Sequence, residues 1–364
     1  MTSTSYPKDS TDWRGVFIKY LVEALAIRSD IDLRLWAPPG EISPQIVNAC
    51  LPEESIWLKH LIEQGGIAHV LRHGGIQRLL TPVKLLWLLR KAYQRQRQVR
   101  LFHVNWLQNA LPLWGTQQPA LVTVLGSDLG LLKLPLMTTL LRAVFQQRAC
   151  ILAPNADWMV AELERRFGDV AHVRPIPFGI DAKWYQLPRI GQSSPLKRWL
   201  VVSRLTKNKI GHLFAWGEKV FQGEQKLHLF GPLQESLSIP SWVQYHGATH
   251  PRDLQENWFP QAAGLITLSQ HDEGRPQVML EAMAAGLPII ASRLPAHENL
   301  LVHQQTGWLT DTPEDFAQAI RWLADPAHNA AAIGVQARAW VQAHIGTWAD
   351  CAQRYVTAYH ELLS

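Results

Sequence analysis

At 364 residues, the chain is too long for a single ordinary core and suits two domains of roughly 150 to 200 residues each. Its apolar share of 47% and its charged share of 18% are typical of a globular protein and exclude a disordered or fibrous chain. The net charge of +5 and the pI near 9.1 favour anionic partners, which include phosphorylated substrates, acidic lipid surfaces and nucleic acids.

The three cysteines, Cys50, Cys150 and Cys351, are widely scattered along the chain. No two of them have the spacing of zinc ligands or of a redox couple, and an odd number argues against a disulfide framework. No apolar run has the length of a membrane span, and the N-terminus lacks the basic-then-apolar pattern of a secretion signal. We therefore expect a cytoplasmic protein, for which peripheral attachment to the inner face of the cell membrane stays open.

Charge is distributed unevenly, because no acidic residue occurs between Glu63 and Asp128. In this stretch the basic residues alternate with leucines and Trp87, a pattern that predicts a basic amphipathic helix. Such a helix is usually a solvated face, but it also fits an anionic membrane surface. Nucleic acid would explain the charge equally well but leaves the glutamates at 273 and 281 unexplained, so we expect no nucleic-acid partner. The basic residues are Arg72, Arg78, Lys84, Arg90, Lys91, Arg95, Arg97 and Arg100.

The first half of the chain alternates helical and extended patterns. Asp12 fits the N-cap of a helix over residues 13–27, and only residues 1–6 precede the loop before it. The opening strand of this half is therefore either short or upstream of the chain. Short apolar runs separated by helical patterns predict βαβ units and a doubly wound α/β domain. The runs expected to form strands are 33–36, 101–104, 121–125 and 150–153.

A change in composition near residues 187–195 predicts a domain boundary. Pro188, Gly191, Ser193, Ser194 and Pro195 interrupt regular structure there. The second half then repeats the alternation, with strands expected at 199–203, 227–230, 243–246, 265–268 and 289–292, and the chain closes with an amphipathic helix over 348–363. We expect a first domain over 1–187, a second, ligand-binding domain over 196–345, and a final helix in 346–364 that packs back on the first domain.

The most informative segment covers residues 271–288 and reads His-Asp-Glu-Gly-Arg-Pro-Gln-Val-Met-Leu-Glu-Ala-Met-Ala-Ala-Gly-Leu-Pro. Pro276 suits the first position of a helix, because its missing N–H would be unpaired there, and Gly274 permits close approach of the backbone. Such a helix N-terminus attracts phosphate, and the carboxylates of Glu273 and Glu281 can accept hydrogen bonds from sugar hydroxyls. With Arg275 in the same loop, the segment predicts a donor-binding site. The ordinary alternative is a capped helix with surface glutamates.

A second cluster follows the first strand expected in the second domain, where residues 203–211 read Ser-Arg-Leu-Thr-Lys-Asn-Lys-Ile-Gly. Arg204 and Lys209 stand at the carboxyl edge of the strand, where open α/β sheets bind ligands. Two cations there can stabilise a diphosphate leaving group as its charge develops. The alternative for Arg204 is a surface ion pair.

At these residues the sequence resembles the retaining GT-B enzymes of glycosyltransferase family 4, most strongly over about 200–309. The resemblance implies two Rossmann-like doubly wound domains facing a central cleft. It also implies that Arg204 and Lys209 bind the donor diphosphate, that Glu273 lies near the transferred sugar and that Glu281 lies at the ribose. Further matches are Tyr245-His246-Gly247, Gly286-Leu287-Pro288, Glu298, Thr306-Gly307-Trp308-Leu309 and Pro177-Phe178-Gly179-Ile180-Asp181.

The first domain also carries partial matches to the family. Arg14 and Gly15 resemble a glycine loop near the acceptor, and Gly126 and Ser127 belong to a similar acceptor-side loop. Many relatives carry a histidine before the second loop, where this chain has Leu125. The resemblance therefore leaves Asp128 and His103 as the catalytic candidates of this domain beside Glu273. For His103, a place in the core is the ordinary alternative.

No metal or other cofactor is expected. Asp30 and Asp32 have the D-x-D spacing of a metal site, but they fall at a helix-to-strand turn of the first domain. A site with cationic side chains and a helix N-terminus does not need a divalent ion.

The sequence thus predicts a retaining glycosyltransferase. It would move a hexose-type sugar from a nucleotide diphosphate donor to a glycan or lipid-linked acceptor, in cell-surface polysaccharide or glycolipid synthesis. One alternative is a catalytically silent GT-B module that binds nucleotide or membrane and partners another enzyme. A nucleotide-sugar epimerase of the same architecture is a third reading.

Overall fold

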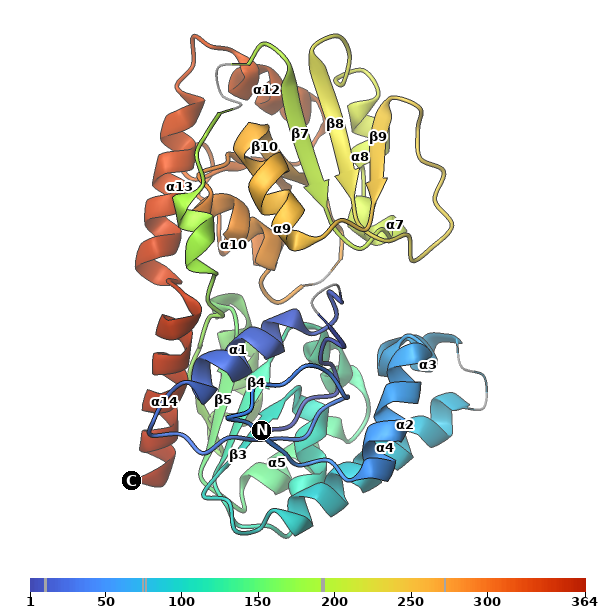
Figure 1. Ribbon diagram of the computed structural model, residues 1–364, viewed down its shortest axis with the longest axis vertical. Helices are drawn as coiled ribbons and strands as arrows, with labels where there is room; N and C mark the ends of the chain where they lie inside the picture. The colour runs from blue at the N-terminus through green and yellow to red at the C-terminus, as the bar shows by residue number, and fades with distance from the viewer. Residues whose placement is uncertain (10–11, 74, 76, 191–193, 272) are drawn as a thin grey trace. The chain divides into compact units, whose positions relative to one another are not determined.

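The computed structural model describes residues 1–9, 12–73, 75, 77–190, 194–271 and 273–364, without the side chains of residues 68, 72, 73, 77 and 78. These residues form two compact units (Figure 1). Unit 1 comprises Met1–Gly179 and Trp348–Ser364, and unit 2 comprises Ile180–Thr347. The change of unit at Ile180 precedes the composition change near 187–195, of which residues 191–193 lie outside the described part of the chain.

Unit 1 contains a parallel sheet in the order β3-β4-β5-β6 and a separate parallel pair, β1-β2. Thr2 joins the two, because it forms parallel bridges with both Trp36 and Val104. The short opening strand expected from residues 1–6 is thus a single bridging position. The strands are β1 (Arg34–Leu35), β2 (Val47–Asn48), β3 (Phe102–Asn105), β4 (Ala120–Val124), β5 (Cys150–Pro154) and β6 (His172–Val173).

The helices of unit 1 bury one apolar side against this sheet. The last helix, α14, packs on α1 and adds Tyr355 and Tyr359 to a core that also contains Leu121 and Ile151 from the sheet. The tyrosine hydroxyl of Tyr355 lies 3.0 Å from Thr123 Oγ1 on β4. The helices are α1 (Val16–Ala26), α2 (Pro52–Glu63), α3 (Gly66–His73), α4 (Gln77–Arg95), α5 (Met137–Phe145), α6 (Val160–Phe167) and α14 (Trp348–Leu363), with the 3₁₀ helices η1 (Leu107–Leu113), η2 (Ser127–Lys133) and η3 (Asp157–Met159).

The start of α1 differs from the expectation. The N-cap is Gly15, in the left-handed region at φ 66°, so that α1 begins at Val16 and not at residue 13. Asp12 caps no helix. Its carboxylate instead binds the guanidinium of Arg14, at 2.8 and 3.0 Å, and accepts the backbone N–H of Lys8. The Asp12 prediction is wrong because a nearby arginine competes for the carboxylate.

Unit 2 contains one six-stranded sheet in the order β12-β11-β10-β7-β8-β9, with every pair parallel. The mixed α/β class with parallel sheets, which the alternating pattern predicts, is confirmed. The strands are β7 (Lys197–Val202), β8 (Gln225–Phe230), β9 (Val243–Gly247), β10 (Ala262–Thr267), β11 (Ile289–Ser292) and β12 (Trp308–Thr310). The helices are α7 (Lys207–Ile210), α8 (Leu213–Gly217), α9 (Pro251–Asp253), α10 (Gln277–Ala284), α11 (Pro295–Glu298), α12 (Pro313–Ala324) and α13 (Ala330–His344), with η4 (Ala182–Gln186), the π-helix η6 (Leu254–Trp258) and η7 (Phe259–Gln261).

Both faces of this sheet are buried, which explains why its strands read as continuous apolar runs. One core gathers α10 and α13 with β10 and β11, and a second gathers α8 and α12 with β7 and β8. None of the helices in the described part of the chain is both long enough and apolar enough to span a bilayer.

Candidate functional site

The strand order of unit 2 reverses next to its first strand. β7 lies between β8, which follows it in the chain, and β10, which comes three strands later. The connections that leave β7 and β10 therefore run to opposite faces of the sheet and open a crevice at the carboxyl ends of the two strands. Parallel α/β sheets bind their ligands at such a point. The loop from β7 to α7 and the loop from β10 to α10 lie there.

The short helix α7 contacts the loop before α10 directly. The backbone N–H of Gln270 in that loop donates to the carbonyl oxygen of Asn208 on α7 at 2.7 Å. Gly211, at φ 53°, is the C-cap of α7, and a Cβ on it would lie 1.9 Å from the carbonyl oxygen of Leu268. Any larger residue would push α7 away from the loop, so the glycine allows their close contact at the sheet edge.

Lys209 and Glu273 form an ion pair between the loops. Thr206 caps α7 by accepting the backbone N–H of Lys209 at 3.2 Å, which orients the start of the lysine side chain. The Lys209 ammonium donates to Glu273 Oε1, and the two side chains are only 12% and 18% exposed. Burial lowers the pKa of Lys209, Glu273 opposes that shift, and the positive charge of Arg204 adds to it. Arg204 itself lies exposed after β7.

The loop before α10 brings the predicted donor-binding residues to the same edge. Gly274 and Pro276 are buried, and Arg275 donates to Asn299 Oδ1 at 2.9 Å. Pro276 is the N-cap of α10, in an extended conformation, and not its first helical residue as expected. Its carbonyl oxygen accepts the N–H of Met279 at 3.1 Å, so the helix starts one residue later than the proline rule suggests.

Glu281 lies on the second turn of α10 and is half-buried. Burial raises its pKa to about 8, and the nearby carboxylate of Asp181 adds to the rise. The side chain of Asp181 is itself fixed, because it accepts the N–H of Lys183 at 2.9 Å. At neutral pH, Glu281 is therefore mostly protonated and able to donate a hydrogen bond.

The sequence did not identify His297, which is linked by hydrogen bonds to the loop before α10. The ring is fully buried on α11, and its Nδ1–H donates to the carbonyl oxygen of Ser292 at 2.8 Å. Ser292 Oγ donates to the carbonyl oxygen of Ser269 at 2.6 Å, and Ser269 Oγ accepts the N–H of His271 at 3.1 Å. This chain of hydrogen bonds links α11 to the loop that carries Glu273. The sequence signal for this network was a serine near the end of each of two adjacent strands, Ser269 after β10 and Ser292 at the end of β11.

The charges of Lys209 and Glu273 also act on the pKa of His297. Burial lowers its pKa, while Glu273 raises it and Lys209 lowers it. Its Nε2 has no hydrogen-bond partner among the described residues. Because Nδ1 carries the proton, Nε2 is a buried acceptor near Lys209 and Glu273.

In unit 1, the acceptor-side candidates lie in two loops. The guanidinium of Arg14 is held by Asp12 and by the carbonyl oxygen of Ile62, 3.0 Å from Nη1. Gly15 is required where it stands, because a Cβ would lie 2.7 Å from the backbone of Ser5. Gly126, at φ 90°, is the N-cap of η2, and Ser127 follows it with an exposed side chain.

Asp128 and His103, the catalytic candidates of unit 1, are both buried. Asp128 is 1% exposed, and its two oxygens accept the N–H groups of Leu107 and Leu125 at 3.1 and 3.0 Å. Burial raises its pKa to about 6 against these hydrogen bonds. The Asp128 carboxylate thus links the backbone at Leu107 to the backbone at Leu125, which is a structural role.

The ring of His103 lies in the core, with Nδ1 2.6 Å from the hydroxyl of Tyr359 and Nε2 2.8 Å from Thr123 Oγ1. Burial lowers its pKa well below the usual value. Both ring nitrogens bind side chains of the same unit, which corresponds to the core position that is the ordinary alternative for His103.

A metal site is not apparent in the described ranges, where no three histidine, cysteine, aspartate or glutamate side chains converge. Of the D-x-D pair, Asp30 is bound by the guanidinium of Arg28 at 3.0 Å from both of its oxygens. The donors gathered at the edge of β7 and β10 are a lysine, an arginine and single carboxylates, which suit an anionic ligand with hydroxyl groups better than a cation.

Known proteins are similar to this chain in unit 2, the part that carries the site. Residues 197–325 match the family model described as Glycosyl transferases group 1. A curated relative, D-inositol 3-phosphate glycosyltransferase of Corynebacterium diphtheriae, is 30% identical over 129 residues. That match covers 35% of this chain and 29% of the relative, so the matched segment spans less than a third of the relative's length.

Solved structures match over nearly the whole chain. Sucrose-phosphate synthase of Thermosynechococcus elongatus has 22% identity and a TM-score of 0.70, covering 95% of this chain and 92% of its own. HepE of Anabaena, solved with UDP and glucose, has 16% identity and a TM-score of 0.67, with 96% of each chain covered. At these identities the likeness shows the fold, and the expected GT-B architecture is confirmed.

Proposed function

Because residues 197–325 form a glycosyl transferases group 1 domain within a GT-B fold, we propose that the chain transfers a hexose-type sugar from a nucleotide diphosphate donor. The observation that carries the proposal is the Lys209–Glu273 pair, nearly buried at the point where the strand order of unit 2 reverses. A cation and a carboxylate at this point match the two halves of such a donor, since the diphosphate is anionic and the sugar carries hydroxyls.

Donor binding would exchange the partners of this pair. Lys209 and Arg204 turn to the diphosphate, which also meets the backbone amides at the start of α10, and the loop residues Gly274, Arg275 and Pro276 fix that start. Glu273 is then released to accept hydrogen bonds from the sugar. Glu281, which is protonated before the donor binds, forms hydrogen bonds with the ribose hydroxyls of the donor.

In the transfer itself, a hydroxyl oxygen of the acceptor bonds to the anomeric carbon as the bond from that carbon to the phosphate oxygen breaks. The nucleoside diphosphate leaves with the electron pair, and the hydroxyl proton passes to it or to solvent. Lys209 and Arg204 stabilise the charge that develops on the leaving group, a contribution of about 2.7 to 4 kcal/mol for one well-placed donor.

The finer parts of the proposal rest on the family resemblance. They are retention of configuration, a glycan or lipid-linked acceptor, and a place in surface polysaccharide or glycolipid synthesis. The acceptor would meet the loops of Arg14, Gly15, Gly126 and Ser127. Assignment to family 4 itself stays a prediction.

A panel of nucleotide sugars tests the donor half of the proposal, starting with UDP-glucose because HepE was solved with it. A true donor raises the melting temperature of the chain, since it binds the folded form alone. Sugar transfer or slow hydrolysis of the same donor should then be measurable and should be lost in Glu273→Gln. A chain that no nucleotide sugar stabilises, or a Glu273→Gln variant with full activity, would remove the basis of the assignment.

The silent-module alternative keeps one specific observation in its favour. Unit 1 has Leu125 before its Gly-Ser-Asp loop, and the buried Asp128 and His103 are fully used in packing. Such a module would be stabilised by a nucleotide and would neither transfer nor hydrolyse a sugar. The two outcomes of the donor assay therefore separate an enzyme from a binding module.

A further inference from the structure

Helix α4 of unit 1 has two apolar faces. Leu85, Leu88, Leu89 and Ala92 point into the core, as an amphipathic helix requires. On another side, Leu79, Leu80, Val83 and Trp87 recur at helical spacing with between 52% and 67% of each side chain exposed. The second face lies outside the core of unit 1, so its apolar residues need a different explanation.

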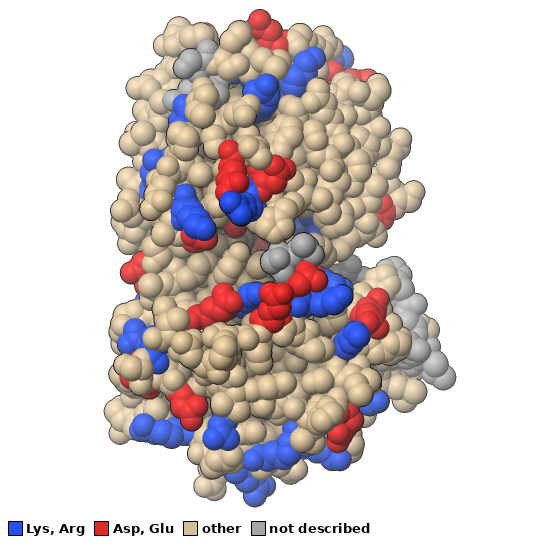
Figure 2. All heavy atoms as spheres, viewed as in Figure 1, with Lys and Arg blue, Asp and Glu red and all other residues tan. Residues whose placement is uncertain are grey.

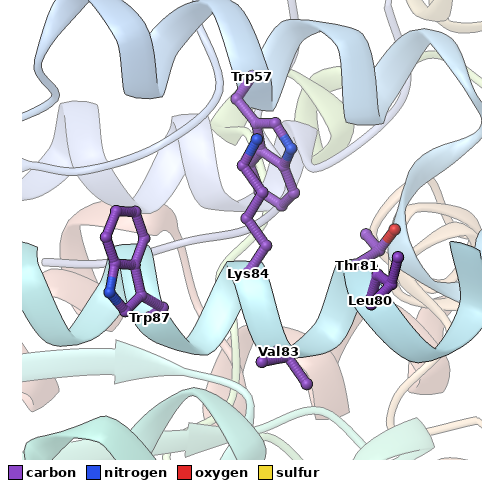
Figure 3. A pocket seen from close by; sticks show the side chains of 6 residues that line it. All are labelled: Trp57, Leu80, Thr81, Val83, Lys84 and Trp87. Atoms are coloured by element: carbon purple, nitrogen blue, oxygen red, sulfur yellow. The ribbon is translucent and has the colours of Figure 1, made fainter.

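The exposed face borders a hollow between α4 and α2. Its volume is about 460 Å³, and it is lined by Trp57, Leu80, Thr81, Val83, Lys84 and Trp87. Figure 3 shows Lys84 reaching from α4 to the ring of Trp57 on α2, with its ammonium 5.3 Å from the ring centre. Lys91 lies 3.7 Å from the ring centre of Trp87 in the same way. Each indole ring thus carries an ammonium beside it.

The basic stretch around this face divides into two classes. Arg95 is bound to the buried carboxylate of Glu54 at 2.7 Å, and Arg90 donates to the carbonyl oxygen of Pro112, so both serve the fold. Lys84 and Lys91 are exposed on the same helix as the apolar residues. The side chains of Arg72 and Arg78 lie outside the described residues.

Net charge alone does not distinguish the surface of α2 and α4 from other parts of the molecular surface. On the face shown in Figure 2, basic and acidic side chains are interspersed over both units. The surface of α2 and α4 is different because exposed apolar side chains, indole rings and lysines occur together. Residues 64–127, which include all of α4, contain no acidic residue, and the exposed carboxylates of Glu53 and Glu63 lie on α2.

We propose that Ile56, Leu80, Val83, Lys84, Trp87 and Lys91, here called the α2–α4 surface, dock onto an anionic lipid bilayer. The apolar side chains enter the boundary between headgroups and acyl chains, the indoles lie at that depth, and the two ammonium groups pair with lipid phosphates. The complementary charge distinguishes this occupant from a second copy of the chain, whose α2–α4 surface would bring like charges together. Docking would hold unit 1 at a membrane whether or not the transfer reaction is as proposed.

Vesicle sedimentation tests the proposal with the full chain and no sugar donor. We expect binding to vesicles of phosphatidylcholine with phosphatidylglycerol, weaker binding at high salt, and little binding to phosphatidylcholine alone. The triple variant Leu80→Ser/Val83→Ser/Trp87→Ser should bind at least about tenfold more weakly. Lys84→Gln/Lys91→Gln should lose about fivefold for each charge.

Matched controls use exposed residues elsewhere. Ile27→Ser/Leu136→Ser/Val335→Ser changes three side chains that are 66% to 72% exposed, and Lys183→Gln/Lys219→Gln removes two exposed charges from unit 2. The apolar control should bind vesicles as the wild type does, and the charge control should do the same. Circular dichroism and melting temperatures confirm that each variant folds.

Three results would overturn the proposal. The first is a lack of binding to anionic vesicles by the folded wild type. The second is equal loss of binding in the controls, which would indicate net charge and not this surface. The third is sedimentation equilibrium showing a dimer that the apolar triple variant abolishes, which would make a second copy the occupant.

Discussion

The two units present comparable sheet edges and use them differently. At the edge of β7 and β10 in unit 2, the side chains of Lys209 and Glu273 bind each other, and Gly211 at the end of α7 lets the two backbones lie close. At the corresponding edge of unit 1, Asp128 binds the backbone of two loops. The first edge keeps charge that a ligand can take over, whereas the second uses its charge to fold. Burial of a carboxylate therefore does not by itself identify a functional site.

The sharpest way to break this comparison is to remove the pair in unit 2 without leaving a lone charge. We expect Lys209→Met/Glu273→Leu to keep or raise the stability of the chain, because a nearly buried ion pair can be replaced by apolar groups of similar volume. Transfer should fall by about 10² to 10³ or more, since the leaving group loses its donor. Initial rates with the donor found by thermal shift, together with urea unfolding, measure both effects.

A matched ion pair serves as the control for that variant. Arg252 and Glu256 form an exposed pair at 2.7 Å in unit 2, and Arg252→Met/Glu256→Leu should leave the transfer rate unchanged. If the Lys209/Glu273 variant retained its rate, or lost most of its stability, the unit 2 edge would be structural and the contrast between the units would disappear.

The opposite result is expected for unit 1. Asp128→Ala leaves the buried N–H groups of Leu107 and Leu125 without an acceptor, at a cost of about 3 kcal/mol in the free energy of unfolding. Urea titration measures this loss, and the exposed Asp32→Ala is the control with no expected change. A stable Asp128→Ala chain that loses only its activity would instead return Asp128 to the catalytic candidates.

The pKa of Glu281 sharpens the comparison through pH. The folded chain holds this proton up to about pH 8, while the unfolded chain releases it near 4.5, so raising the pH through that window destabilises the wild type. Because the glutamine of Glu281→Gln does not titrate, this variant should have a higher free energy of unfolding than the wild type above pH 8 and no such difference at pH 4. A fully buried carboxyl would give a difference of about 5 kcal/mol, and we expect roughly 2 kcal/mol for this partly exposed one. Equal pH profiles of stability would show that Glu281 is ionised in the folded chain.

The smallest effect concerns His297. His297→Ala breaks the hydrogen bond to Ser292 and should lower the transfer rate about tenfold by loosening the loop of Glu273. His297→Asn places an amide N–H where Nδ1–H was and should recover most of the rate. Rates at saturating donor distinguish the two variants, and equal losses in both would assign the role to the ring as a whole.

Much of unit 2 could be predicted from its sequence, because strands buried on both faces read as apolar runs. The expected strands at 227–230 and 289–292 lie within β8 and β11. Lys209 and Glu273 could be placed at one edge for the same reason, since residues after parallel strands share that edge. β6 and β12, with two and three residues, are too short for a periodic pattern to show.

The rest depends on tertiary contacts that no local pattern records. A Gly-Ser-Asp loop looks the same whether its aspartate faces a substrate or two backbone amides, and only the approach of Leu107 decides. His297 itself could not be singled out, because a single histidine on a short helix has many uses and only the serines near the ends of β10 and β11 hinted at its partners. The extended conformation of Pro276 is likewise not given by its type, because the ring fixes φ and leaves ψ open to both helical and extended values.

The return of α14 to unit 1 has a consequence for biosynthesis. Unit 2 is one continuous stretch of chain, whereas unit 1 lacks the helix bearing Tyr355 and Tyr359 until residues 348–363 leave the ribosome. The region translated second can thus acquire its complete core before the region translated first, the reverse of the usual order. A nascent chain stalled at residue 347 would carry a folded unit 2 and an amino-terminal half with an open apolar face.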